Sequence, residues 1–265
     1  MNNPLRSFSL MLEALNDLQP EIEAAQAGQT NPLPADPLSK LGPLPKDALL
    51  LGLASDGLPL LLNLHDPLPG PLLIAADPAA GKTALLQAIA QTAAQLHTPS
   101  DVQFGVVTNY PDEWLHLAES EHCVGVFPTY HDSAVDFLNS LSGWAHNNKG
   151  GNQSILLLLD DLESIEQMVF DARQTLRWLL LRGPSRRVWP LVAMNPQRSD
   201  QVQPWLDAFR TRIFGRIEAG RSADTLSGAP GSALKDLQAG SQFALREGDD
   251  WLIFSLPKAQ KEGKQ

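Results

Sequence analysis

Residues 71–84 read PLLIAADPAAGKTA, an apolar run of strand type that passes through a small-residue loop into a helix-type run. The loop ends in Gly81, Lys82 and Thr83. A helix that begins in this way directs its first backbone amides and the positive end of its dipole at an anion. The lysine of such a loop reaches the β- and γ-phosphates of a nucleotide, and the hydroxyl that follows ligates magnesium. The sequence therefore predicts a phosphate-binding loop with bound Mg²⁺.

The predicted nucleotide contacts extend along this loop. They are Asp77, Pro78, Ala79, Ala80, Gly81, Lys82, Thr83 and Ala84. The loop departs from the usual pattern at its first position, where Ala76 stands in place of glycine. A side chain there removes some freedom to adopt glycine-only backbone angles, so we expect a weaker match. An ordinary strand-to-helix turn that begins Gly-Lys-Thr is the alternative interpretation.

A second chemical signal lies downstream at residues 154–161, SILLLLDD, an apolar strand that ends in two carboxylates. We expect Asp160 to orient Mg²⁺ through water, and Asp161 to stand where a catalytic carboxylate polarises the attacking water. Aspartate is one methylene shorter than the glutamate usual at this position. Hydrolysis is therefore expected to be slow or lost unless the neighbouring backbone shifts. Alternatively, the pair caps the following helix, and both roles are compatible.

The next strand-type segment ends on Asn195, whose amide is suited to hold the attacking water or to sense the γ-phosphate. Asp161 and Asn195 thus form the predicted catalytic set. A turn-forming asparagine before Pro196 is an equal alternative. An arginine finger that acts on a neighbouring subunit's nucleotide is a further expectation. Its candidates are Arg182, Arg186, Arg187, Arg210, Arg212 and Arg216, and their spacing does not choose among them.

Composition limits the class of protein. The 265 residues are 43% hydrophobic and 19% charged, which suits one substantial core. No apolar run reaches the roughly 20 residues of a membrane span, and no secretory pattern is present. The single cysteine, Cys123, excludes an internal disulfide framework and fits a reducing compartment. We therefore expect a cytoplasmic protein without direct membrane insertion.

The net charge and the distribution of arginines and histidines limit which partners the chain is expected to bind. The net charge of −10 argues against a protein that coats nucleic acid over its whole surface, although ten of the twelve arginines fall within residues 173–221. The six histidines show no ligand spacing for a metal other than nucleotide-bound magnesium.

Strand-type and helix-type segments alternate from residue 48 onward. Residues 48–64 predict a β-hairpin around Asp56-Gly57. Further strands are expected at 71–76, 102–108, 124–128, 154–160 and 189–195, helices at 82–97, 111–120, 133–147 and 164–182, and then a closing run of short strands. Such alternation predicts an α/β fold with a mainly parallel sheet flanked by helices.

The chain is expected to divide into four parts. Residues 1–27 contain an amphipathic N-terminal helix, which packs on the main domain or docks on another subunit. Residues 28–47 form a Pro-rich linker, residues 48–257 the nucleotide-binding domain, and residues 258–265 a polar tail expected to be disordered.

The order of these segments resembles the motor domain of the FtsK/SpoIIIE family, including the ATPase modules of type VII secretion. The resemblance covers residues 48–257. Its carriers are LGLASDGLPLLLNL, PLLIAADPAAGKT, HTPSDVQFGVV, SILLLLDDLE, VWPLVAMNPQR, and FRTRIFGRI followed by LSGAPGSALKDLQAGSQFAL. It implies a RecA-like P-loop NTPase that binds ATP and Mg²⁺, forms a ring as a homo- or hetero-oligomer, and moves DNA or polypeptide through a central pore.

Residue by residue, the resemblance carries Lys82 and Thr83 over as nucleotide ligands and Asp160 as the magnesium-side carboxylate. Asp161 and Asn195 stand where the family has its catalytic acid and its sensor.

The departures from the family at Ala76, at Asp161 and at residues 194–196 resemble degenerate modules of secretion ATPases that act as scaffolds or regulators. A weak ATPase and a non-hydrolysing module therefore both stay open. The cargo is open too, because the candidate pore loop at residues 146–151 is only mildly basic.

Overall fold

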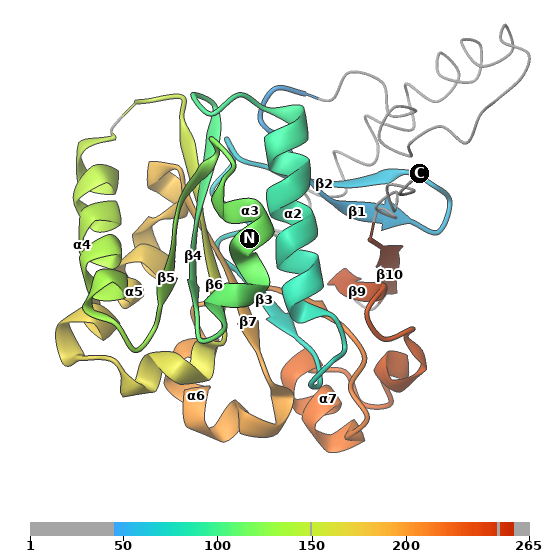
Figure 1. The fold of residues 1–265 in the computed structure, drawn as a ribbon. Helices are drawn as coiled ribbons and strands as arrows, with labels where there is room; N and C mark the ends of the chain where they lie inside the picture. The colour runs from blue at the N-terminus through green and yellow to red at the C-terminus, as the bar shows by residue number, and fades with distance from the viewer. Residues whose placement is uncertain (1–44, 149, 248–249, 257–265) are drawn as a thin grey trace, which may run out of the picture.

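The computed structural model describes residues 45–148, 150–247 and 250–256, which form one sheet flanked by helices (Figure 1). The predicted N-terminal helix, most of the predicted linker and the predicted tail lie outside the described residues. None of the helices in the described ranges is long and apolar enough to cross a membrane.

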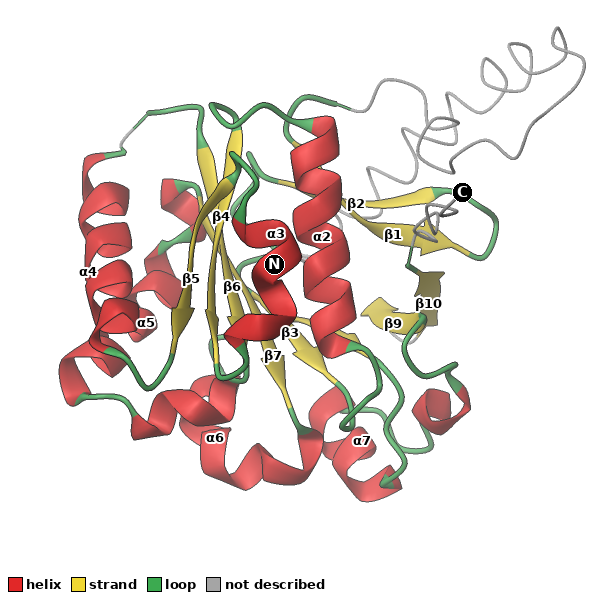
Figure 2. Ribbon diagram, in the orientation of Figure 1, coloured by secondary structure: helices red, strands yellow, loops and turns green. Residues whose placement is uncertain are grey.

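Figure 2 shows the elements by type. The strands are β1 (Ala48–Ala54), β2 (Pro59–Asn63), β3 (Leu72–Ala75), β4 (Val102–Thr108), β5 (Cys123–Pro128), β6 (Ser154–Asp160), β7 (Val188–Met194), β8 (Thr211–Phe214), β9 (Gln242–Glu247) and β10 (Asp250–Ser255). The α-helices are α2 (Lys82–Leu96), α3 (Leu115–Ala118), α4 (Asp132–Asn147), α5 (Phe170–Arg182), α6 (Ser199–Leu206) and α7 (Gly220–Ser227). Short 3₁₀ helices are η2 (Pro111–Trp114), η3 (Leu162–Gln167), η4 (Pro184–Arg186), η5 (Pro196–Arg198) and η6 (Ala233–Asp236).

The strand order is β2-β1-β10-β9-β8-β3-β7-β6-β4-β5. Neighbours from β2 to β8 pair antiparallel, and neighbours from β8 to β5 pair parallel. This confirms the predicted mainly parallel α/β sheet. Strand β7 lies between β3 and β6, with Ala75 level with Met194 and Asp160 level with Ala193. The ends of the strands that carry the predicted chemistry therefore lie side by side.

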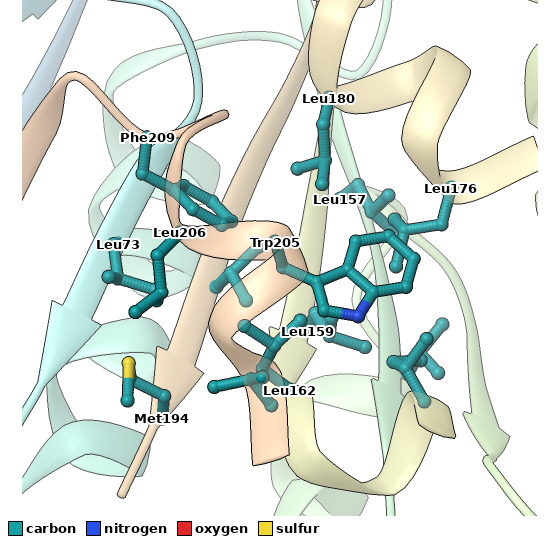
Figure 3. Packing of buried hydrophobic residues seen from close by; sticks show 14 of the residues in the cluster. Leu73, Leu157, Leu159, Leu162, Leu176, Leu180, Met194, Trp205, Leu206 and Phe209 are labelled. Carbon is teal, nitrogen blue, oxygen red and sulfur yellow. The ribbon is translucent and has the colours of Figure 1, made fainter. Parts of the chain in front are cut away.

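Both faces of the sheet are covered, which explains the uninterrupted apolar run of β6. Successive side chains of a strand point to opposite faces. Accordingly, Leu156 and Leu158 belong to a core shared with α2, and Leu157 and Leu159 to a core shared with α4, α5 and α6. Figure 3 shows Trp205 of α6 among leucines of this second core. Full burial of one leucine side chain contributes about 1.5–3 kcal/mol.

The predicted hairpin is present as β1 and β2. Gly57 adopts φ +86°, which glycine tolerates, and Asp56 Oδ1 accepts a hydrogen bond from the Leu58 amide at 3.0 Å. Strand β1 also pairs with β10, so the hairpin extends the main sheet instead of standing apart from it.

The predicted continuous helix over 164–182 is wrong. The chain forms η3, becomes extended at Met168 and Val169, and only then begins α5 at Phe170. The break allows Ile165 and Leu176 to enter the same core, although they lie on separate helices.

The predicted helix over 111–120 also consists of two short pieces, η2 and α3. In addition, the closing region contains α6, α7 and η6 between its strands. In α6, Val202, Trp205 and Leu206 are buried at helical spacing. This burial outweighs the helix-breaking tendency of Pro204.

Candidate nucleotide-binding site

The predicted phosphate-binding loop connects β3 to α2 at the edge of the sheet where β6 and β7 also end (Figure 1). Gly81 adopts φ +96° and Ala79 φ +59°, so the loop turns sharply before α2. Helix α2 has no side-chain cap at its N-terminus and no acidic residue in its first turn. Its start therefore presents backbone donors and the positive end of the helix dipole to an anion.

Lys82, the first residue of α2, is held by its own loop. Its ammonium donates hydrogen bonds to the carbonyl oxygens of Ala76 at 2.7 Å and Asp77 at 3.0 Å. Burial lowers the pKa of Lys82, and the charge of Glu163, followed by that of Asp160, opposes this shift. The ammonium thus lies in a partly desolvated position among acceptors, where phosphate oxygens are suitable partners.

Thr83 and Asp160 come together from elements far apart in the sequence. The Thr83 hydroxyl donates to the Asp160 carboxylate at 2.9 Å and 3.1 Å from its two oxygens. Desolvation raises the pKa of Asp160. The fully buried Trp114 of η2 directs its indole N–H at Asp160 Oδ2, at 3.4 Å. No sequence signal pointed to Trp114.

These oxygens fit magnesium. A hydroxyl and a carboxylate are hard oxygen ligands, and Mg²⁺ is commonly held by one or two carboxylates together with nucleotide phosphates and water. Within the described ranges no group of three or more His, Cys, Asp or Glu side chains could hold a metal. A magnesium ion at Thr83 and Asp160 would therefore take further ligands from a nucleotide and from water.

Two distant segments brace the loop. Asp77 accepts the Glu218 amide on Oδ2 at 2.8 Å, and its own amide donates to the Arg216 carbonyl at 3.0 Å. From the segment before β9, the Gly240 amide donates to the carbonyl of Ala80 at 3.1 Å. The loop is therefore fixed on both sides by the region after β8.

Ala76 does not adopt the glycine-only backbone angles on which the expected weaker match was based, and the weaker match itself stays a prediction. The described residues other than glycine with positive φ are Ala79, Asp161 and Arg187, so Ala76 does not occupy a glycine-only conformation. Its methyl group instead lies beside Gly215 of the segment after β8, where an added Cβ would be only 2.8 Å away. A small residue at position 215 makes room for the alanine.

Asp161 caps the helix that follows it, as the alternative interpretation proposed. Its Oδ1 accepts the Glu163 amide at 3.2 Å, and its Oδ2 accepts from Asn109 Nδ2 at 3.0 Å. Asn109, which follows β4, also accepts a hydrogen bond from the Thr129 hydroxyl. The backbone of Asp161 has φ +123°, a strained value for a residue with a side chain.

Asn195 is a cap as well. Its Oδ1 accepts the amide of Gln197 at 3.0 Å at the start of η5, which is the geometry of the turn-forming alternative. Its backbone amide donates to Glu163 Oε1 at 2.5 Å.

Glu163 is the residue of this site that the sequence interpretation missed. Its side chain is 6% exposed, and burial together with its hydrogen bond to Asp161 raises its pKa to about 8. The available signal was an acidic residue between Leu162 and Ile165, both of which are fully buried. A carboxyl in such surroundings needs polar partners.

The six candidate arginines have different surroundings. Arg212 donates to the carbonyls of Phe209, Leu226 and Leu206, which commits its guanidinium to the fold. Arg187 is likewise bound to Asp47 and to backbone carbonyls. Arg216 pairs with Glu218 beside the phosphate-binding loop.

Arg182 and Arg210 are exposed and Arg186 is half-buried. Arg182 and Arg186 precede the start of β7, and Arg210 precedes the start of β8. All three therefore lie at the edge of the sheet opposite the phosphate-binding loop.

No protein-family model matches this chain, and no curated protein matches it by sequence. Solved structures do match. The cytoplasmic domain of the type VII secretion ATPase EccC from Thermomonospora curvata aligns with a TM-score of 0.66 and 17% identity over 89% of this chain and 32% of that one. EssC (ATPases 2 and 3) from Geobacillus thermodenitrificans aligns with 0.67 and 14% over 84% and 49%. The pCW3 conjugation coupling protein TcpA, as a monomer with ATPγS, aligns with 0.59 and 16% over 80% and 66%.

The chain has the fold of an FtsK/SpoIIIE-type ATPase domain. This FtsK-type fold corresponds to about a third of the EccC chain and half of the EssC chain. At these low identities the likeness concerns the fold, so the function has to be argued from the side chains of the site.

Proposed function

We propose that this chain is an ATP-binding, FtsK-like motor-type domain that hydrolyses ATP as part of an oligomer. The observation that carries the proposal is the meeting of Lys82, Thr83 and Asp160 beside the uncapped start of α2. All three side chains have the chemistry that a nucleoside triphosphate with magnesium requires.

Each residue has a task in this proposal. Lys82 exchanges the carbonyls of Ala76 and Asp77 for oxygens of the β- and γ-phosphates, and the first amides of α2 hold the remaining phosphate oxygens. Thr83 and Asp160 hold magnesium, Asp160 through water. When bound, Mg²⁺ neutralises charge on the β- and γ-phosphates. The loop residues from Asp77 to Ala84 enclose the phosphates.

Translocation of DNA or polypeptide in the cytoplasm is the proposed process. EccC (ATPases 2 and 3) from Thermomonospora curvata has been solved in complex with a signal sequence peptide, and this complex favours a polypeptide as the cargo proposed for this chain. The net charge of −10 is easier to reconcile with a polypeptide than with DNA. An oligomer would bring an exposed arginine of one subunit, such as Arg182 or Arg210, within reach of a neighbour's nucleotide.

A second candidate function is a nucleotide-binding module that does not hydrolyse ATP and serves as a scaffold or regulator. The observation in its favour is that Asp161 and Asn195 both act as helix caps. A carboxylate engaged by Asn109 and by the Glu163 amide is less available to a water molecule.

The deciding experiment measures Mg²⁺-dependent ATP binding and phosphate release over a series of protein concentrations, with Lys82→Ala and the control Lys235→Ala. Lys235 lies in η6 and is exposed. Turnover that rises with concentration, persists in Lys235→Ala and vanishes in Lys82→Ala supports an oligomeric ATPase. Binding without turnover at any concentration supports the second candidate. Equal, weak binding by all three proteins contradicts both.

A further inference from the structure

Glu163 links the ends of β6 and β7 in the candidate site. It lies in the first turn of η3, directly after β6, and its Oε1 accepts the Asn195 amide at the end of β7 at 2.5 Å. Because β7 lies between β3 and β6, this contact places the carboxyl between the end of the Asp160 strand and the strand that leads into the phosphate-binding loop.

The charge of the same carboxyl acts on Lys82. Of the carboxylates around the Lys82 ammonium, Glu163 interacts with it most strongly, then Asp160 and Asp77, and Asp161 only after these. Charge interactions weaken with distance and with exposure to solvent. Lys82 is the residue expected on the γ-phosphate, and Glu163, held by the Asn195 amide at the end of β7, faces the same region of the site.

Asp161 lies beside Glu163, whose carboxyl forms a hydrogen bond with it, and it has further partners. Its two carboxylate oxygens are engaged by the Glu163 amide and by Asn109, a residue on the side of β4. Its backbone is strained, with φ +123°. Strain of this kind persists only where the surrounding structure imposes it.

We propose that Glu163, and not Asp161, is the carboxyl that accepts the proton of the attacking water. The inference rests on the proposed ATPase function. The water oxygen forms a bond to the γ-phosphorus, and one water proton passes to Glu163 in its ionised form, whose share grows as pH rises toward the pKa of about 8. The bond from the γ-phosphorus to the bridging oxygen breaks, and its electron pair leaves with ADP. Glu163 afterwards returns the proton to solvent, and the Asn195 amide keeps the carboxyl oriented throughout.

The test compares four variants of the full chain with wild type: Glu163→Gln, Glu163→Asp, Asp161→Asn and the control Glu166→Gln. Glu166 belongs to the same short helix, but it binds Arg173 and Trp205 on the core side. The measurements are affinity for a fluorescent ATP analogue with Mg²⁺, steady-state phosphate release, and the melting temperature.

We expect Glu163→Gln to lower turnover about 100-fold or more, with affinity unchanged within about threefold. Glu163→Asp keeps an acid one methylene further back, so it should fold as wild type and lose about 10–100-fold. Asp161→Asn and Glu166→Gln should retain at least about a tenth of wild-type turnover.

Other outcomes overturn the inference in distinguishable ways. Loss of turnover in Asp161→Asn with retention in Glu163→Gln assigns the proton to Asp161. If Glu163→Gln does not fold, full turnover in Glu163→Asp contradicts the inference. A wild type that binds ATP without turnover also overturns it and leaves nucleotide binding intact, whereas a wild type that does not bind ATP refutes the proposed function itself.

Discussion

The phosphate-binding half of the site, residues 76–84, and its water-facing half, residues 160–163 with Asn195, use their polar groups differently. In the first half, helix α2 starts without a side-chain cap, and the Lys82 ammonium rests on carbonyls of its own loop. In the second half, Asp161 and Asn195 each cap a 3₁₀ helix. The backbone amides at the start of α2 are thus available to a ligand, whereas the side-chain oxygens of Asp161 and Asn195 accept hydrogen bonds within the fold.

This difference separates binding from hydrolysis. An uncapped helix start binds an anion through its own backbone amides and dipole, so it needs few side chains from the rest of the protein. A water-activating carboxylate must instead be both well oriented and free on one oxygen. A chain can therefore retain the first property while the second passes to another residue or disappears, and the variants below separate the two.

The largest effect is expected at Gly81, which is needed by the phosphate-binding half. An added Cβ would lie 2.6 Å from Gly240 Cα, and φ is +96°. Gly81→Ala should therefore lower the free energy of unfolding by about 2–4 kcal/mol and weaken nucleotide binding. Urea unfolding and an ATP-analogue titration measure both.

Gly220→Ala is the matched control, because a Cβ at this first residue of α7 meets nothing within 4 Å. It should stay within about 0.5 kcal/mol of wild type. A Gly81→Ala protein as stable as this control would show that the loop is not braced by Gly240.

The next effect concerns Glu163 and its pKa of about 8, raised from an ordinary 4.5 by burial and by Asp161. Between these values the unfolded chain has released the proton that the folded chain retains. The free energy of unfolding of wild type should therefore fall as pH rises through this window. Glu163→Gln removes the ionisation, so its stability relative to wild type should grow by about 1–3 kcal/mol from pH 6 to pH 8.5.

Urea unfolding at the two pH values measures this gain. Glu166→Gln, which keeps an oxygen for Trp205 but loses the ion pair with Arg173, should change in stability by a similar amount at both. A difference in stability between Glu163→Gln and wild type that does not change between the two pH values would contradict the raised pKa. A variant that gains stability while it loses turnover would show a carboxyl retained for chemistry at the expense of stability.

A smaller effect is expected for Asn195, because a helix cap needs only a side-chain oxygen, whereas a sensor of the γ-phosphate needs the amide donors. Asn195→Ala removes the oxygen that accepts the Gln197 amide and should lower the free energy of unfolding by about 1 kcal/mol. Asn195→Ser supplies another cap oxygen and should stay within about 0.5 kcal/mol of wild type. Phosphate release by Asn195→Ser then isolates the sensor role, since serine lacks the amide donors: turnover near wild type makes Asn195 a cap alone.

Much of the fold could be predicted from the sequence, because strands buried on both faces leave apolar runs such as SILLLLD. Prediction failed where a segment does not keep one helical or strand periodicity along its length. The break at Met168 and Val169 depends on how Ile165 and Leu176 share one core, and no local pattern reveals that. Helix α6 was not predicted, and it forms despite Pro204 because Val202, Trp205 and Leu206 are buried.

The candidate site also contains contacts that the sequence could predict and contacts that it could not. The contact of Thr83 with Asp160 followed from two motifs whose strands end at one sheet edge. The roles of Glu163 and Trp114 depend on contacts between elements distant in sequence, which spacing alone does not give. The commitment of Arg212 to backbone carbonyls was equally invisible.

The smallest effect is expected at Ala76, one of the departures from the family pattern in the sequence. Its backbone is not in a glycine-only conformation, and its methyl group is buried against Gly215. Ala76→Gly should therefore leave ATP affinity within about twofold of wild type and cost about 0.5–1 kcal/mol of stability through chain entropy. Gly215→Ala should cost more, because its Cβ would meet Ala76 at 2.8 Å.

The double variant Ala76→Gly/Gly215→Ala exchanges the two small residues and tests their coupling. Its loss of stability should be smaller than the sum of the two single losses, because each substitution makes room for the other. Strict additivity in urea unfolding, or a tenfold gain of affinity in Ala76→Gly alone, would show that the alanine does perturb the loop. With Ala76 accommodated, the departures that can still limit turnover all lie in the water-facing half.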